Sequence, residues 1–133
     1  MAFQLPPQLA ADTFHITELK ICRVLLMNNS NAPWLILVPM REYLREIYDL
    51  SEDDYALVMN EVRLVTQKFA EYTKADKMNV AALGNVVPQL HIHIIARFKN
   101  DKAWPNPVWG KLPESPYSDA DKGKILNDLQ KIL

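Results

Sequence analysis

The chain has 133 residues, of which 49% are hydrophobic and 23% charged, and its net charge is −1. These values fit one globular domain with a core of its own. A near-neutral chain without a long basic stripe argues against duplex nucleic acid as a partner, although a nucleotide remains compatible with it. The single cysteine, Cys22, excludes an internal disulfide and fits a reducing compartment.

No targeting or membrane segment is expected. The first residues, MAFQLPPQLAADTF, lack the basic stretch followed by a long apolar stretch that marks a signal peptide. No apolar run approaches the ~18 residues needed to cross a bilayer. We therefore expect a cytoplasmic protein without membrane contact.

The first half of the chain predicts strands followed by helices. β-Branched residues and partial alternation in 16–28 predict a strand, and the Asn-rich segment 28–33 predicts a loop. The continuous apolar run 34–40 predicts a second strand that closes at Pro39. A short helix is expected over 41–50.

Residues 51–73 predict the longest helix. Ser51 is the expected N-cap, and acidic residues at 52–54 suit the positive end of the helix dipole. Apolar residues recur every three or four positions and predict one buried stripe: Tyr55, Val58, Val62, Val65, Phe69 and Tyr72. The other side still carries Leu57, Leu64 and Ala70, more apolar residues than a solvated face requires, which predicts a homodimer.

The second half predicts two more strands and a last helix. The strands are expected over 78–84 and 89–98, and the prolines and glycine of 101–110 predict an irregular loop. Ser118 can cap a helix that reaches Leu133. Strand pairs separated by helices predict a single α+β domain over 1–133 with a mainly antiparallel sheet, two main helices and a C-terminal helix. Its core is expected at about 12–110, followed by the loop and helix 111–133; neither GxGxxG nor a P-loop is present.

One stretch, VVPQLHIHIIARF at 86–98, carries two of the three histidines. Side chains alternate along a strand, so Gln89, His91, His93, Ile95 and Arg97 are expected on one face. The opposite face would be apolar throughout. Two imidazoles, an amide and a guanidinium in one row predict a hydrogen-bond relay or a grip on an extended anion.

Three interpretations of this row compete. The histidines could be half-buried side chains without a role. They could bind a metal with His15 or a carboxylate as third ligand, although Arg97, four residues after His93, would oppose a cation. They could act on phosphate, because a neutral imidazole attacks phosphorus and a second one donates to phosphate oxygens. Arg97 would then be an anion partner. The aromatic residues of 101–110, Trp104 and Trp109, would either plug the sheet edge or form a lid over the phosphate.

The segment QLHIHII resembles the active-site strand of the histidine triad (HIT) superfamily, whose pattern is His-φ-His-φ-His-φ-φ with φ apolar. In this pattern Gln89 stands at the first histidine, His91 at the second and His93 at the third. The resemblance covers roughly 12–110. It includes an asparagine about ten residues before the motif (Asn79), a glycine a few residues before it (Gly84), and a Trp-Pro pair after it at 104–105.

This resemblance implies a HIT-like fold and a homodimer in which a helix and a strand pair across a two-fold axis. Members of the superfamily cleave or transfer nucleoside phosphoryl groups, as diadenosine tetraphosphate hydrolases, nucleoside phosphoramidases and uridylyltransferases do. It implies that His91 attacks the α-phosphorus to form a nucleotidyl-imidazole, while His93 hydrogen-bonds phosphate oxygens. No cofactor and no metal are expected, and the substrate is a nucleotide or dinucleotide. The remaining substrate-binding candidates are Asn28 and Asn29 at the ribose, Asn79 and Asn85 near the phosphate, Arg97 and Trp104.

Two departures bear on activity. Gln89 can donate and accept hydrogen bonds but cannot become cationic or transfer a proton as imidazolium does. A Gln-Ser or Gln-Thr pair normally precedes the triad, whereas this chain has Asn85 followed by Val86. The catalytic prediction therefore names His91, His93 and Gln89 with weak turnover. The alternatives are a non-catalytic nucleotide-binding module with a degenerate triad and a metal-binding protein that uses the His-x-His pair.

Overall fold

The computed structural model describes residues 3–133 and has three α-helices, one 3₁₀ turn and five strands within that range. In chain order the elements are α1 (Pro7–Asp12), β1 (Thr13–Glu18), β2 (Cys22–Met27), β3 (Trp34–Pro39), η1 (Ile47–Asp49), α2 (Glu52–Thr73), β4 (Lys77–Ala82), β5 (Ile92–Arg97) and α3 (Asp119–Ile132). In the part of the chain from residue 3 onward, no helix combines the length and apolar character that crossing a membrane would require.

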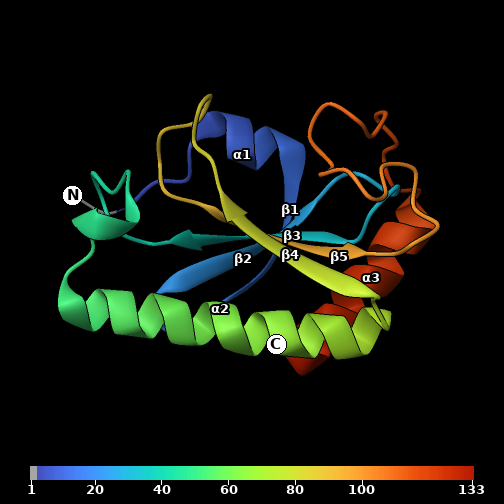
Figure 1. The fold of residues 1–133 in the computed structure, drawn as a ribbon. Coiled ribbons are helices and arrows are strands. Elements are labelled where there is room, and N and C mark those ends of the chain that lie inside the picture. Colours follow the sequence, from blue (N-terminus) through green and yellow to red (C-terminus); the bar gives the residue numbers. More distant parts are fainter. Residues whose placement is uncertain (1–2) are drawn as a thin grey trace.

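The five strands form one antiparallel sheet in the order β1-β2-β3-β5-β4 (Figure 1). The last strand in the sequence, β5, therefore lies between β3 and β4. His93 is paired with Ile36 on one side and Ala81 on the other. Strand β5, which carries His93, is therefore hydrogen-bonded to a neighbouring strand on each side, and this pairing fixes the direction of its side chains.

The sheet separates two hydrophobic clusters. Helices α2 and α3 cover one face, and α1 with the loop after β5 covers the other (Figure 1). Alternation along β5 divides its residues between the two faces as expected. Ile92, Ile94 and Ala96 pack against the two long helices, while Ile95 packs with Leu9 of α1 on the opposite face. The α+β class and the antiparallel sheet predicted from the sequence are confirmed.

Helix α2 matches its prediction closely. The Ser51 hydroxyl accepts a hydrogen bond from the backbone N–H of Asp54, as an N-cap should. Four of the six predicted stripe residues are buried: Val58, Val62, Val65 and Phe69. The prediction that Tyr55 is buried is wrong, because its side chain is 47% exposed. The fold of α2 onto β5 is therefore carried by the middle of the helix.

The strand expected over 16–28 is a hairpin of two strands, β1 and β2. The turn between them contains no Gly, Pro, Asn or Asp, so no local signal marks it. A distant side chain stabilises it instead. The buried carboxylate of Glu61, on α2, accepts hydrogen bonds from the backbone N–H groups of Ile21 (3.2 Å) and Cys22 (2.9 Å). This contact spans about 40 residues of sequence and is invisible to pattern analysis.

The helix expected over 41–50 is also wrong, since only the short 3₁₀ turn η1 forms there. Tyr43 adopts a positive φ of 57°, which a helix cannot contain. The Leu44 carbonyl accepts a bond from the Leu90 N–H rather than from its own segment. The Asp49 carboxylate then accepts from the N–H of Glu46 at 2.9 Å. The segment is folded by contact with the histidine strand and not by helical periodicity.

The remaining elements differ from prediction only at their ends. The strands predicted over 34–40 and 78–84 are β3 and β4, and the predicted last helix is α3, with Ser118 as N-cap to the Asp121 N–H. The strand predicted over 89–98 begins only at Ile92, so Gln89 lies before the paired region. Helix α1 was not predicted, because its six residues are too few for a periodic signal.

Candidate functional site

His91 and His93 line a cavity of about 520 Å³ between α1, strands β2, β3 and β5, the loop that joins β4 to β5, and the loop after β5. Both side chains are largely buried, at 7% and 5% exposure. Most of the cavity wall is apolar: Leu9, Met27, Ile36, Leu83, Val86, Val87 and Trp109. The polar residues on the wall are the two histidines, Gln8, Asp12 and Asn85. We call this space the histidine cavity.

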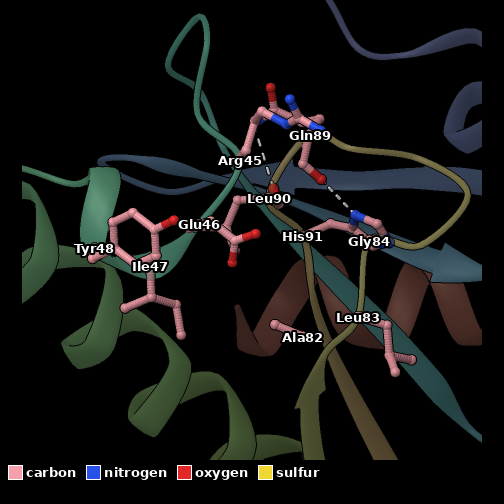
Figure 2. A pocket seen from close by; sticks show the side chains of 10 residues that line it. All are labelled: Arg45, Glu46, Ile47, Tyr48, Ala82, Leu83, Gly84, Gln89, Leu90 and His91. Atoms are coloured by element: carbon pink, nitrogen blue, oxygen red, sulfur yellow. Dashed lines mark hydrogen bonds between the residues drawn. The ribbon is translucent and has the colours of Figure 1, made fainter.

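The tautomer of His91 follows from its backbone contact. Its Nδ1 lies 2.7 Å from the backbone carbonyl oxygen of Gln89, the contact drawn as a dashed line in Figure 2. A carbonyl oxygen only accepts, so Nδ1 must carry the hydrogen and donate it. In neutral His91 the Nε2 atom therefore holds a lone pair. An imidazole in this tautomer is ready to act as a nucleophile through Nε2.

The tautomer of His93 is the opposite one. The indole N–H of Trp34 donates to His93 Nδ1 at 2.9 Å, and an indole nitrogen cannot accept. Nδ1 is therefore unprotonated and neutral His93 carries its hydrogen on Nε2. Burial, together with the positive charge of a protonated His91, lowers the pKa of His93 from 6.5 to about 4. At neutral pH His93 is an uncharged hydrogen-bond donor.

The two rings lie against each other with centroids 5.0 Å apart. Trp109 stands edge-on to His93 at the same centroid distance and to Trp34 at 5.7 Å. One imidazole offers a lone pair and its neighbour offers an N–H within a largely apolar cavity. This pair can attack an electrophilic centre with one ring while the other holds an oxygen attached to that centre.

A second, smaller cavity of about 170 Å³ lies beside His91 (Figure 2). His91, Leu83 and Gly84 line both cavities, so His91 stands between them. The other residues around the small cavity come from the segment before α2, the end of β4 and the entry to β5: Arg45, Glu46, Ile47, Tyr48, Ala82, Gln89 and Leu90. Figure 2 shows the Glu46 carboxylate turned toward the middle of this space.

Gln89 occupies the position of the missing histidine but lines only the small cavity, not the histidine cavity. Its side-chain amide donates to the backbone carbonyls of Pro39 and Leu90, each at 3.3 Å. Its contact with His91 is made by its backbone carbonyl. Gln89 thus positions His91 through a group that any residue would supply, while its side chain holds the strand entry in place.

Arg97, predicted as an anion partner, is only 1% exposed and is engaged inside the protein. Its guanidinium forms an ion pair with Asp101 at 2.8 Å and also donates to Asn79 Oδ1 and to the Asn106 carbonyl. The ion pair holds the pKa of Asp101 low, at about 2. Neither Arg97 nor Asn79 lines the histidine cavity. The structure does not support the expectation that Arg97 grips phosphate, because its guanidinium is buried and makes four hydrogen bonds inside the protein.

Trp104 also lies away from the histidine cavity. The Arg97 guanidinium lies over its ring, with Cζ 5.6 Å from the ring centroid. Trp109, the other tryptophan of this loop, takes the place at the cavity wall instead. Asn85, which was expected to bind substrate near the phosphate, lines the histidine cavity. Asn28 and Asn29 line a neighbouring cavity of about 400 Å³, which shares Trp109 with the first.

The metal alternative lacks a third ligand in this structure. His15 lies exposed on the edge strand β1. Within residues 3–133 no three His, Cys, Asp or Glu side chains are gathered as ligands of one ion would be. The Nδ1 atoms of His91 and His93 are moreover occupied by a carbonyl and an indole.

Trp34 is the residue of the site that sequence reasoning missed most clearly. It opens an apolar strand and gives no sign of facing a histidine. Finding Trp34 from the sequence would have required the pairing register of β3 and β5. In that register Trp34 lies opposite Ile95, which is two residues after His93 and on the same face of the sheet.

The lowered pKa of His93 predicts a pH-dependent stability. The unfolded chain binds a proton at this residue below about 6.5, whereas the folded protein binds it only below about 4. The free energy of unfolding should therefore be at its full value above pH 6.5 and fall by about 2–3 kcal/mol between pH 7 and pH 4.5. Urea unfolding of the wild type and His93→Gln at both values measures this. Equal losses in the two proteins would contradict the assignment.

Comparisons with known proteins place the chain in a family. The model of the HIT domain family matches residues 8–100. A search of curated proteins gave no match.

Solved structures resemble the chain over nearly its whole length. A histidine triad protein from Marinobacter aquaeolei VT8 is 46% identical, with 100% of this chain and 97% of that chain covered and a TM-score of 0.97. One from Bradyrhizobium japonicum is 42% identical over 99% and 98%, with a TM-score of 0.96. A third, from Sinorhizobium meliloti 1021, is 38% identical over 98% and 97%, with a TM-score of 0.95. The chain therefore belongs to the HIT domain family of histidine triad proteins.

Proposed function

We propose that this protein cleaves or transfers a nucleoside phosphate through a covalent nucleotidyl-His91 intermediate. The observation that carries the proposal is the pair of opposite tautomers, with a lone pair on His91 Nε2 and a hydrogen on His93 Nε2. Membership of the HIT family supports nucleotide binding, hydrolysis or transfer in general. The apolar wall of the histidine cavity suits a nucleoside base, since ligand cavities combine apolar walls with a few placed polar groups.

The proposed reaction has two steps. The lone pair of His91 Nε2 attacks the α-phosphorus, a bond from phosphorus to nitrogen forms, and the bond to the leaving-group oxygen or nitrogen breaks with its electron pair. His93 Nε2–H donates to a non-bridging phosphate oxygen, where negative charge develops. Water, or another acceptor hydroxyl, then attacks phosphorus, loses its proton and releases His91. The leaving group would depart into the small cavity on the other side of His91.

Replacing His91 with Ala tests the nucleophile. Turnover of a dinucleoside polyphosphate should be lost, while affinity for the nucleotide product stays within about 1–2 kcal/mol, because the lost bond forms only during reaction. Steady-state kinetics and calorimetric titration with adenosine 5′-monophosphate measure the two effects. His15→Ala is the matched control, since His15 is exposed on β1. Normal turnover by His91→Ala would rule the proposal out.

Gln89 should limit the range of leaving groups. An amine or alcohol needs a proton as it departs, and general acid assistance is typically worth about 10²–10⁴-fold. Because Gln89 cannot supply a proton, phosphoramidates should turn over slowly, whereas nucleotide or pyrophosphate leaving groups depart without protonation. Gln89→His should then accelerate phosphoramidate cleavage selectively in a side-by-side rate assay of both substrate classes.

Two results would contradict this role of Gln89. One is wild-type cleavage of phosphoramidates as fast as dinucleoside polyphosphates, and the other is no acceleration by Gln89→His. A wild type that binds nucleotides at micromolar concentration, turns over neither substrate and is not rescued by Gln89→His would favour the alternative of a non-catalytic nucleotide-binding module. The neutral side chain of Gln89, bonded to two backbone carbonyls, is the observation that keeps this alternative open.

We also propose that the protein is a homodimer. The edge strand β4 exposes Val80 (48%), and the adjacent helix α2 exposes Leu64 (46%) and Met59 (37%). Leu57, in contrast, packs partly against the core and does not contribute to such a surface. An apolar edge strand next to an apolar helix face suits pairing with a second copy.

The dimer predicts a mass of twice the 15.3 kDa chain by light scattering at micromolar concentration. Val80→Glu should shift the population toward monomer, because it places a charge in the paired edge. His15→Glu, on the opposite edge strand β1, should leave the mass unchanged. A wild-type monomer would contradict the proposal.

A further inference from the structure

The second step of the proposed reaction needs a group that takes a proton from water, and the two imidazoles cannot supply it. At that stage His91 Nε2 is bonded to phosphorus and has no lone pair. His93 Nδ1 accepts from the Trp34 indole, and its Nε2 already carries a hydrogen. Gln89, at the position of the missing histidine, has an amide side chain, which is not a base. The proton acceptor must therefore come from elsewhere in the site.

Two carboxylates line the cavities beside His91, Asp12 in the histidine cavity and Glu46 in the small cavity. Displacement at phosphorus proceeds with the attacking and departing groups roughly in line. The attacking water must therefore enter from the side that the leaving group has left, which in the proposed reaction is the small cavity. Of the two carboxylates, the one that shares this space with His91 is Glu46.

The small cavity also suits water better than the histidine cavity does. Its volume of about 170 Å³ has room for several water molecules, each of which takes about 30 Å³ of liquid volume. Water in a cavity needs polar partners, and polar side chains stand all around this one: Arg45, Glu46, Tyr48, Gln89 and His91. The wall of the histidine cavity is mostly apolar.

The position of Glu46 is fixed by its own segment and by the entry to β5. Glu46 is the N-cap of η1, where its carboxylate accepts from the Asp49 N–H and its own N–H donates to the Asp49 carboxylate at 2.9 Å. The Leu44 carbonyl accepts from the N–H of Leu90, the residue before His91, at 2.8 Å. Figure 2 shows the Glu46 carboxylate turned toward the middle of the cavity that His91 also lines.

We propose that Glu46 is the general base of the second step and takes a proton from the water that attacks nucleotidyl-His91. The water oxygen bonds to phosphorus, the bond from phosphorus to His91 Nε2 breaks, and its electron pair returns to that nitrogen. The water proton passes to the Glu46 carboxylate and from there to solvent, because Glu46 is exposed. This inference rests on the proposed function, since it needs the covalent intermediate, and it assigns the hydrolysis of that intermediate to the small cavity.

The test follows diadenosine tetraphosphate by rapid quench, which separates the first product, adenosine triphosphate, from the second, adenosine monophosphate. Glu46→Gln should release a burst of triphosphate equal to the enzyme concentration and then turn over about 10²–10⁴-fold more slowly than the wild type. Mass spectrometry of the intact protein should show nucleotidyl-His91 accumulating. Hydroxylamine, a strong nucleophile that needs no base, should restore release. A glutamine can still accept from the Asp49 N–H, so the segment keeps its fold.

Two further variants serve as controls. Glu71→Gln, the same change at an exposed position near the end of α2, should behave as the wild type. Asp12→Asn, at the other carboxylate, should not accumulate the intermediate.

Three results would overturn the inference. One is normal turnover by Glu46→Gln, another is a burst slowed as much as the later turnover, and the third is accumulation of the intermediate by Asp12→Asn instead. A folded wild type that forms neither the intermediate nor the products would refute the proposed function itself, and the role of Glu46 with it.

Discussion

The hydrogen bond from Trp34 to His93 determines the chemistry of the whole site. An indole nitrogen can only donate, so this single contact of 2.9 Å fixes which nitrogen of a buried imidazole lacks its proton. Burial lowers the pKa of His93 and so keeps the ring neutral, and the indole N–H facing Nδ1 then fixes Nε2 as the atom that carries the hydrogen. A cationic His93 would hold phosphate more strongly, but it would also oppose the positive charge that develops on His91 when His91 attacks phosphorus.

This contact depends in turn on the sheet. Trp34 begins β3 and His93 lies on β5, 59 residues later, and the antiparallel register brings them onto one face. The β5 strand is central, so a shift in register would need to break hydrogen bonds to both β3 and β4. The buried Arg97 adds a further constraint at the far end of β5. Its bonds to Asp101 and Asn79 join the strand to the loop after it and to the neighbouring strand.

The sequence allowed the central features to be predicted because they have a local period. Alternation along β5 correctly separated the face of His93 from the apolar face, although Gln89, which precedes the strand, does not reach the histidine cavity. The spacing of Val58, Val62 and Val65 correctly predicted the buried stripe of α2. The errors share a physical cause. The β1–β2 turn depends on Glu61, and the 41–50 segment depends on Leu90; both contacts are made by residues far away in the chain. No pattern within the segments themselves records them.

The candidate site shows the same contrast between what a local pattern predicts and what contacts with distant residues decide. Residue type suggested that an arginine four residues after His93, on the same strand face, would meet an anion. Four residues of strand place Arg97 at most about 14 Å from His93, where Asp101 and Asn79 bind its guanidinium. In that position a buried guanidinium is more stable with a carboxylate of its own chain than open to a ligand. With this cation withdrawn, phosphate binding would rest on neutral N–H donors. Such a site would hold a phosphate mainly by the placement of its hydrogen-bond donors and less by total charge. The two imidazoles are oriented by the backbone carbonyl of Gln89 and the indole of Trp34. These two groups therefore matter as much as the imidazoles themselves.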